Sequence, residues 1–262
     1  MSSYALLWKG DRLPTVGVLQ SLINRAGATL KIDGIFGEKT HTALVEFQRQ
    51  RQMSPDGIAD KATWERLMYQ DNLPLIDIID IFDQNLYENQ AAYIVKETGG
   101  TPVFLGGMSN GLAQLAVELS TARVAFLLRI IGHGCPGVQA ISMGKGGWIS
   151  YRHGHKVYNM FPHETSSLNN KNMKHLPIGA LQATFGPYAS VELHGCHVAA
   201  GATGHRFIKT LANMLRVPVT AGTKSQRSAI RFDGPTVTAL PHRTSLAEWC
   251  AKLPEFMPVT VP

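Results

Sequence analysis

Two apolar runs constrain the possible fold of this chain most strongly. Each is followed by a glycine and a chemically reactive side chain. In residues 191–201, a short apolar run ends at Cys196, and small residues follow it. A helical pattern then extends over about residues 204–215. This order predicts a strand, a tight turn and a helix, with the Cys196 thiol at the carboxyl end of the strand, where open α/β sheets bind ligands. A thiol near a helix N-terminus also tends towards the nucleophilic thiolate.

A second apolar run places a base in a matching position. Residues 123–131 have the pattern of a buried strand and are followed by Gly132-His133-Gly134. If the two strands are neighbours, His133 and Cys196 emerge side by side at one edge of the sheet. Imidazole, with an ordinary pKa of about 6.5, can accept a thiol proton near neutrality. We also expect the backbone N–H groups of Gly134 and Cys196 to form an oxyanion hole, because the flanking glycines allow a substrate to approach closely.

The alternative interpretation of these two residues is purely structural. A free cysteine is often only a small buried residue, and a histidine can end a strand without taking part in chemistry. Cys135 lies near His133 in the sequence, but it occupies a Gly-Cys-Pro-Gly turn and does not precede a helix, so Cys196 is the preferred nucleophile. No residue that orients His133 is assigned, and a backbone carbonyl can serve this purpose.

The two motifs together resemble those of the caspase-like cysteine peptidases of clan CD, which include caspases, gingipains and clostripain. A closer resemblance, over about residues 75–225, is to a caspase-like domain of unknown function found in large bacterial surface proteins. The matching residues are Ile130-Ile131-Gly132-His133-Gly134 with Pro136-Gly137, and Leu193-His194-Gly195-Cys196 with Ala199-Ala200-Gly201. The resemblance implies an α/β domain with a mainly parallel sheet flanked by helices, and catalysis by His133 and Cys196 with help from Gly134.

The resemblance also suggests where a substrate is held. In caspase-like families the segment after the next strand helps to form the specificity pocket, which corresponds here to residues 223–231, and we assign Thr223 to it. Those families usually have a residue other than histidine directly after the cysteine, whereas His194 and His197 bracket Cys196 in this chain. His194 is therefore included as a candidate substrate contact.

A long stretch between the two motifs is a further candidate for substrate binding. Residues 142–178 are rich in Gly, Asn, Ser and Lys and predict a long loop or a small insertion. Trp148 and Tyr151 in this stretch are expected to line a substrate groove. The alternative is a solvated loop that these aromatic residues merely anchor.

The first seventy residues contain an internal repeat. Asp33-Gly34 and Asp56-Gly57 are turn-forming pairs 23 residues apart, and each leads into a helical pattern of apolar residues. Together with a helical pattern over residues 16–23, they predict three short helices joined by two similar loops. We therefore expect a compact helical bundle.

This bundle resembles the type 1 peptidoglycan-binding domain. The matching pieces are residues 16–20, Asp33-Gly34-Ile35-Phe36-Gly37, Thr40, Ala43, Phe47-Gln48, Asp56-Gly57-Ile58 and Thr63-Trp64. The resemblance implies attachment to the bacterial cell wall, with Asp33, Phe36 and Asp56 as candidate contacts. The alternative is that the aspartates only form turns; Phe47, Trp64 and Leu67 are expected in the core.

The chain is expected to divide into two domains. We predict a peptidoglycan-binding domain at residues 1–72 and a caspase-like α/β domain at residues 73–262, joined by the short polar segment 70–74. From residue 75 onwards, strand and helix patterns alternate, which favours a parallel sheet with right-handed crossovers. A β-hairpin is predicted around Asp233-Gly234.

Composition excludes several classes of protein. Hydrophobic residues make up 44% and charged residues 17% of the chain, which are globular values, and there is no apolar run long enough to span a membrane. The net charge of +6 favours anionic partners, but no basic block supports nucleic-acid binding. Three cysteines fit a functional thiol better than a disulfide scaffold. No cofactor is predicted.

We predict a cell-wall-targeted cysteine hydrolase that cleaves amide bonds in peptidoglycan stem peptides or cross-links. The alternatives are a peptidase acting on a wall-associated protein, a zinc-dependent peptidoglycan amidase, and a non-catalytic wall-binding protein. The chain has no His-Glu-x-x-His or paired Cys-x-x-Cys motif, so no metal site is assigned. The first residues lack the pattern of an ordinary signal peptide, so we expect delivery to the periplasm or wall by another route, as an antibacterial effector or a phage lysin. An effector of this kind implies an immunity protein in its producer.

Overall fold

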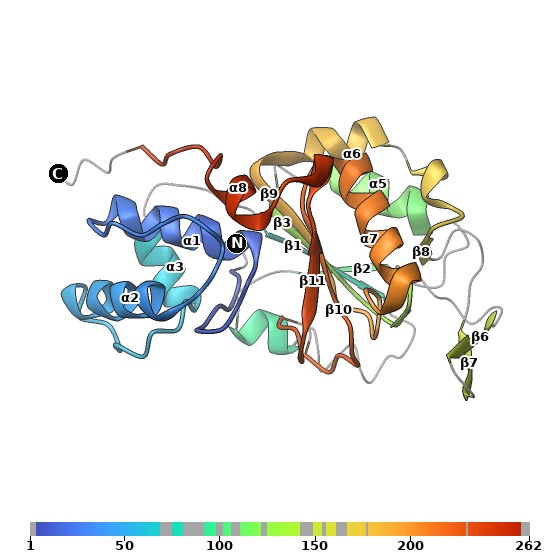
Figure 1. The fold of residues 1–262 in the computed structure, drawn as a ribbon, viewed down its shortest axis with the longest axis horizontal. Helices are drawn as coiled ribbons and strands as arrows, with labels where there is room; N and C mark the ends of the chain where they lie inside the picture. Colours follow the sequence, from blue (N-terminus) through green and yellow to red (C-terminus); the bar gives the residue numbers. More distant parts are fainter. Residues whose placement is uncertain are drawn as a thin grey trace.

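The computed structural model shows a helical bundle followed by an α/β unit (Figure 1). It describes residues 4–68, 75–80, 92–97, 102–105, 111–121, 125–141, 149–153, 156–160, 167–176, 178–228 and 230–257. None of the helices within these ranges is long and apolar enough to cross a membrane.

The bundle consists of the three predicted helices, α1 (Pro14–Arg25), α2 (Glu38–Gln50) and α3 (Lys61–Met68). Pro14 occupies the first position of α1, where a missing N–H costs no hydrogen bond. Leu19, Leu22 and Trp64 are fully buried at its centre, and the Trp64 Nε1–H donates to the Ala5 carbonyl at 2.6 Å. The prediction of a helical N-terminal unit is therefore confirmed.

In each half of the internal repeat, a buried glutamine holds the Asp-Gly loop through a network of hydrogen bonds. In the first loop, the buried Gln20 amide donates to Asp33 Oδ1 at 3.0 Å and to Thr40 Oγ1 at 3.1 Å, and its Oε1 accepts the Asp33 and Gly34 N–H groups. Gln48 repeats this arrangement in the second loop. It donates to Asp56 Oδ1, Ile58 O and Thr63 Oγ1, and it accepts the Gly57 N–H at 2.8 Å.

The α/β unit is built on a six-stranded sheet in the order β11-β10-β9-β3-β1-β2. The strands are β1 (Leu75–Asp80), β2 (Val103–Leu105), β3 (Ala125–Ile131), β9 (Phe185–Leu193), β10 (Val219–Gly222) and β11 (Thr236–Ala239). All neighbours are parallel except β10 and β11. This is a doubly wound order, in which the chain reverses its direction across the sheet at β1 and β3. The predicted mainly parallel sheet is confirmed.

Three helices cover one face of this sheet: α5 (Gly111–Thr121), α6 (Ile178–Thr184) and α7 (Gly201–Leu215). Leu115, Leu181 and Phe207 on these helices form one apolar core with Ile130 and Val191 from the strands. Figure 1 shows the three helices together on the side of the sheet away from the bundle.

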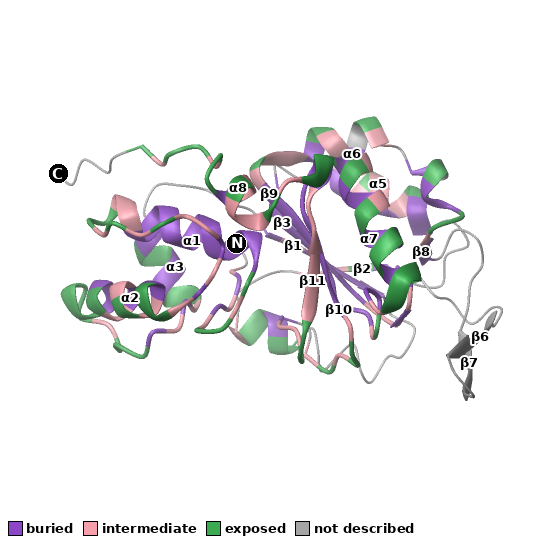
Figure 2. Cartoon of the chain, viewed as in Figure 1, coloured by how far each residue is buried: buried purple, intermediate pink, exposed green. Residues whose placement is uncertain are grey.

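The bundle lies on the other side of the sheet, and the two units share a core. Leu75 and Leu127, from β1 and β3, belong to the same buried cluster as Leu19 and Trp64 of the bundle. Figure 2 shows that the central strands are buried along most of their length. The two units therefore pack together directly.

The C-terminal segment returns to the bundle. Helix α8 (Leu246–Cys250) packs on α1, where the fully buried Cys250 thiol lies in space left by the missing side chains of Gly17 and Gly34. This agrees with the expectation that Cys250 is a small buried residue. Farther on, the Phe256 ring stacks on Tyr188 of β9 at 4.5 Å.

Two smaller sheets lie outside the six-stranded one. Strands β4 (Gly134–Cys135), β5 (Val138–Ala140) and β8 (Ser167–Asn169) form an antiparallel sheet, and β6 (Ile149–His153) pairs with β7 (Lys156–Met160). Short 3₁₀ helices occur at Met173–His175 and Pro241–Arg243, and residues 92–97 are helical. The stretch 142–178, predicted as a long loop or a small insertion, thus contains three strands, a 3₁₀ helix and the start of α6 in its described parts.

The predicted hairpin at Asp233-Gly234 is wrong. Residues 236–239 do form a strand, β11, but it pairs with β10 through Thr220 and Thr238 rather than with residues 228–232. Asp233 instead accepts the Arg227 and Ser228 backbone N–H groups with its carboxylate. An Asp-Gly pair that favours a turn does not determine which strands flank it.

Candidate functional site

The two predicted catalytic residues follow neighbouring strands in matching register. β3 and β9 are parallel, Ile130 pairs with Leu193, and the His194 N–H donates to the Ile130 carbonyl at 2.8 Å. His133 and Cys196 each come three residues after that pair, and both are half-buried. The expectation that the two strands are neighbours is therefore confirmed. The two residues lie at the carboxyl edge of the sheet, where α/β proteins bind ligands.

Two glycines allow the histidine and cysteine loops to touch. A Cβ placed on Gly195 would lie 2.8 Å from the Gly134 Cα and 2.9 Å from the His133 carbonyl oxygen. A Cβ on Gly134 would lie 2.8 Å from the Gly195 Cα and 2.6 Å from a Val198 methyl carbon. Only glycine fits at either position without a shift of backbone. The sequence identified both glycines, and their function is to bring the two loops together.

The backbone geometry agrees with the predicted oxyanion hole. In the β4–β5 pair, Ala140 N–H donates to the His133 carbonyl, so Gly134 faces Gln139 in a non-hydrogen-bonded pair. Such a residue directs its N–H away from the partner strand. Among the described residues, the Cys196 N–H donates no hydrogen bond. The Gly134 N–H therefore points away from β5, and no acceptor for the Cys196 N–H lies within the described ranges.

Gln139 joins the two loops and was not singled out by the sequence. Its fully buried side chain accepts the Gly195 N–H at 2.9 Å and donates to the Ala140 carbonyl at 2.9 Å. It thus links the strand after His133 to the residue before Cys196. A glutamine within a short strand carries no distinguishing signal, because its partner is 56 positions away in the sequence.

The Cys196 thiol lies against the segment that follows β10. The Gln226 backbone N–H donates to Cys196 Sγ at 3.3 Å. His197 fixes this segment, because its ring nitrogens lie 3.2 Å from the Thr223 carbonyl and 3.2 Å from the Ser225 hydroxyl. Since a carbonyl can only accept, Nδ1 carries the proton that binds Thr223. The histidine that departs from the family pattern is therefore an anchor for this segment.

Cys196 is the only one of the three cysteines that is partly exposed. Burial raises the pKa of the Cys135 thiol to about 11. Burial, and secondly Asp33, raises the pKa of Cys250 to about 12. These two thiols remain protonated at neutral pH, so neither is a competent nucleophile. Cys196 begins a turn at residues 196–199, and α7 starts only at Gly201, so the helix dipole acts on the thiol less directly than expected.

The structure places one of the four proposed substrate contacts inside the fold. The His194 side chain is completely buried, stacked on Phe232 at 4.3 Å and 3.1 Å from Glu192, so it does not face an open groove. Thr223 is half-buried, and its hydroxyl donates to the Pro235 carbonyl at 3.0 Å. Its assignment to the specificity pocket stays a prediction.

The other two proposed contacts are not described at the level of side chains. Tyr151 lies on β6, where the backbone alone is described. Trp148 lies outside the described residues. Their assignment to a substrate groove stays a prediction.

Of the three candidate wall contacts of the bundle, Phe36 lies inside it, Asp33 is half-buried and Asp56 is exposed. Phe36 is completely buried, which contradicts its assignment as a surface contact. Its backbone N–H donates to the Asp11 carbonyl at 2.9 Å, which draws the residue into the core. Asp33 and Asp56 each accept a backbone N–H two residues later, at 3.0 and 2.9 Å, so they act as turn formers.

No cluster of three or more His, Cys, Asp or Glu side chains suitable for a metal ion occurs among the described residues. His194 is paired with Glu192 in the interior. The zinc alternative thus gains no support from this part of the chain.

Comparison with known proteins identifies both units. A family model for a peptidoglycan binding domain matches residues 12–67, which confirms the N-terminal prediction. A second model, described as a domain of unknown function, matches residues 81–229. It agrees with the expected domain of unknown function, while its description names no activity.

Two solved structures are similar to parts of the chain. One is a peptidoglycan-binding protein from Clostridioides difficile in complex with glutamine hydroxamate, 36% identical over 26% of this chain and 42% of that one, with a TM-score of 0.25. The other is a Burkholderia AP3 phage endolysin, 28% identical over 52% of this chain and 45% of that one, also with a TM-score of 0.25. The chain spans less than half the length of each. Because the second family model covers more than half of the chain, the protein belongs to the family of domains of unknown function DUF4347, and it carries an N-terminal peptidoglycan binding domain.

Proposed function

We propose that the protein is a cell-wall-targeted cysteine hydrolase that cleaves an amide bond in peptidoglycan stem peptides or cross-links. The observation that carries this proposal is the matching register of His133 and Cys196 after two adjacent parallel strands. The contact between Gly134 and Gly195 supports it, because these glycines hold the two loops close together.

The proposed reaction has two steps. His133 takes the Cys196 Sγ proton, and the thiolate attacks the amide carbonyl carbon to form a tetrahedral oxyanion held by the Gly134 and Cys196 N–H groups. Collapse of this intermediate breaks the C–N bond, the amine leaves with the proton from His133, and a thioester remains. Water, deprotonated by His133, then attacks the thioester, releases the carboxylic acid and restores the thiol.

The segment at Gln226 bears on access to the thiol. Its backbone N–H donates to Sγ at 3.3 Å, so we expect a substrate carbonyl to approach from the side of Gly134 and Gly195. In this proposal the Gly134 and Cys196 N–H groups lie on that side. Attack from there places the developing oxyanion next to its donors.

The N-terminal bundle supports the choice of substrate. A peptidoglycan binding domain attached to the hydrolase raises the local concentration of wall peptides around Cys196. The shared core of the two units holds the bundle in a fixed position beside the sheet. We accordingly place the action of the protein at the cell wall, reached by secretion or injection.

The test is digestion of purified peptidoglycan sacculi, with products resolved by mass spectrometry. The expected result is new stem-peptide fragments from the wild-type protein and none from Cys196→Ala or His133→Ala. Cys250→Ala is the matched control, because this thiol is buried between α8 and the bundle. It should cleave like the wild type.

Three other outcomes would each reject part of the proposal. Cleavage by Cys196→Ala would remove the thiol from the mechanism. Binding to sacculi without cleavage by any variant would leave a wall-binding protein. Activity that a chelator abolishes and added zinc restores would identify the metal-dependent alternative.

A further inference from the structure

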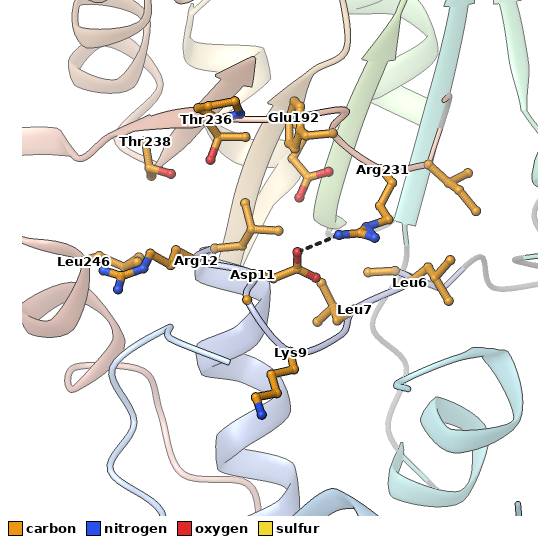
Figure 3. A pocket seen from close by; sticks show the side chains of 17 residues that line it. Leu6, Leu7, Lys9, Asp11, Arg12, Glu192, Arg231, Thr236, Thr238 and Leu246 are labelled. Carbon is orange, nitrogen blue, oxygen red and sulfur yellow. Dashed lines mark hydrogen bonds and ion pairs between the residues drawn. The ribbon is translucent and has the colours of Figure 1, made fainter. Parts of the chain in front are cut away.

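A cavity lies where the bundle meets the sheet, away from His133 and Cys196, and it has a volume of about 630 Å³. Residues 5–13 form one wall, and the segment 230–236 with strands β9 and β11 forms the other (Figure 3). A volume of this size, lined by apolar side chains and a few charged groups, is typical of small-molecule sites.

Two carboxylates from different units face each other across this cavity. Asp11 comes from the N-terminal segment and Glu192 from β9, and Figure 3 shows Glu192 pointing towards Asp11. Burial raises the pKa of Asp11, and the nearby Glu192 carboxylate adds to the rise. Asp11 has protein partners, since it accepts from Arg231 at 3.2 Å and from the Trp8 N–H at 2.9 Å.

Glu192 is the less satisfied of the two carboxylates. Its side chain is only 7% exposed, and among the described residues its one hydrogen-bond partner is His194 Nε2 at 3.1 Å. Arg129, its neighbour on β3, is already bound by Asp77 through two contacts of 2.6 and 2.9 Å. A buried carboxylate with so little compensation is costly unless a cation reaches it.

His194 lies on the side of Glu192 away from the cavity. Its Nε2 is 3.1 Å from Glu192 Oε2, and its Nδ1 is buried and has no partner within the described part of the chain. Glu192 lines the cavity and His194 does not, so the carboxylate is the group of this pair that a ligand can reach.

The cavity is also lined by cationic side chains, Lys9, Arg12 and Arg231. The Arg231 guanidinium binds Asp11 at 3.2 Å and remains partly exposed, whereas its Nε–H is buried and makes no hydrogen bond to any described residue. A ligand carboxylate is a natural partner of a guanidinium. The cavity thus presents the Glu192 carboxylate, which forms no ion pair with a described Lys or Arg, and the Arg231 guanidinium.

We propose that this cavity binds a zwitterionic amino-acid group, with its ammonium between Glu192 and Asp11 and its carboxylate at Arg231. Wall peptides contain such a group where a diamino acid keeps one free ammonium and carboxylate. This identification rests on the proposed function at the wall. The site would hold a stem peptide through its diamino acid, separately from the bond that Cys196 attacks.

Calorimetric titration with free diaminopimelic acid tests the proposal. The full-length Cys196→Ala protein is used, so that binding is measured without turnover. We expect binding of diaminopimelic acid and none of pimelic acid, which has the same carboxylates but no ammonium groups. Glu192→Gln should weaken binding about tenfold or more, the effect of losing one buried charged contact. The matched control Glu46→Gln changes an exposed carboxylate on α2 and should bind like the parent.

Equal binding of pimelic acid, or no binding of diaminopimelic acid up to about 10 mM, would overturn the proposal. Thermal unfolding of each variant shows whether it is folded. If Glu192→Gln does not fold, Asp11→Asn is titrated in its place and should also weaken the binding of diaminopimelic acid. Unchanged binding by Asp11→Asn would reject the site.

The outcomes separate this site from the proposed hydrolase. If the protein binds sacculi but not diaminopimelic acid, the proposed ligand site is rejected and wall attachment by the bundle is not affected. If it binds diaminopimelic acid but cleaves no sacculi, the ligand site is supported and the proposed hydrolase is rejected.

Discussion

The two buried glutamines of the bundle allow a quantitative test of how its loops are held. Gln20 accepts two backbone N–H groups, those of Asp33 and Gly34, at 2.9 and 3.0 Å. Gln48 accepts one, that of Gly57, at 2.8 Å. Truncation to alanine removes the acceptor and leaves these N–H groups without a partner.

The expected loss of stability follows from the number of backbone N–H groups that each glutamine accepts. Each buried donor left unsatisfied costs about 1–3 kcal/mol, and the lost side-chain packing adds to it. We therefore expect Gln20→Ala to lower the free energy of unfolding by about 3–5 kcal/mol and Gln48→Ala by about 2–3 kcal/mol. Gln50→Ala is the matched control, because Gln50 is exposed on α2, and its effect should stay within about 0.5 kcal/mol.

The unfolding of the bundle can be followed at one atom. The Trp64 Nε1–H donates to the Ala5 carbonyl at 2.6 Å, and the ring packs against Phe126 of β3, so its indole NMR resonance reports the bundle packed on the sheet. Urea titrations read from this resonance should show lower midpoints with unchanged slopes. Equal losses for the Gln20 and Gln48 variants, or a loss below about 1 kcal/mol for Gln20→Ala, would refute the reasoning.

Three further predictions concern the α/β unit and its contact with the bundle. Gly134→Ala and Gly195→Ala should each abolish Cys196-dependent cleavage of sacculi and cost about 1–3 kcal/mol of stability by thermal unfolding, because the added methyl overlaps backbone; full activity in both would contradict this. Arg129→Met should cost about 3–5 kcal/mol in urea unfolding by leaving Asp77 charged and buried, and adding Asp77→Leu should restore part of the loss. Burial raises the pKa of Asp11 above its ordinary 3.8, so its stabilising contribution is present below about pH 4 and is lost as the pH rises through the folded-state pKa. The wild type should therefore lose stability relative to Asp11→Asn as the pH rises above about 4, and a constant difference would contradict this.

The edge of the sheet was predictable from sequence because its signals are local. An apolar run that ends beside glycine, as at His133 and at Cys196, indicates both a buried strand and the place where it stops. Parallel strands share one carboxyl edge, so the two side chains were expected there once the strands were neighbours. The register of Ile130 with Leu193 then supplied what the sequence left open.

The errors arose where long-range pairing decides the outcome. Asp233-Gly234 is a sound turn signal, but β11 pairs with β10 because Thr220 and Thr238 meet, at 2.9 Å between their hydroxyls. Phe36 follows a turn and was expected at the surface, yet its N–H is bound by the Asp11 carbonyl. Neither partner is marked by spacing or composition.

A row of polar residues crosses the sheet, and it could not be predicted from the sequence. Its central residue, Glu192, lines the cavity between the bundle and the sheet. Asp77, Arg129, Glu192, Thr220 and Thr238 are register partners on five neighbouring strands. Each lies in a different segment, so no sequence pattern reveals the row.

The row is satisfied at both ends and incomplete at its centre. Asp77 and Arg129 bind each other, as do the hydroxyls of Thr220 and Thr238. Glu192 stands between these pairs, and among the described residues its one hydrogen-bond partner is His194. If the row served only to fix how the bundle packs on the sheet, its central carboxylate would gain most from a protein cation. The cations that line the cavity form no ion pair with Glu192 among the described residues, and Arg231 binds Asp11. An acidic pair at this position favours a site whose cation arrives with a ligand over a purely structural contact.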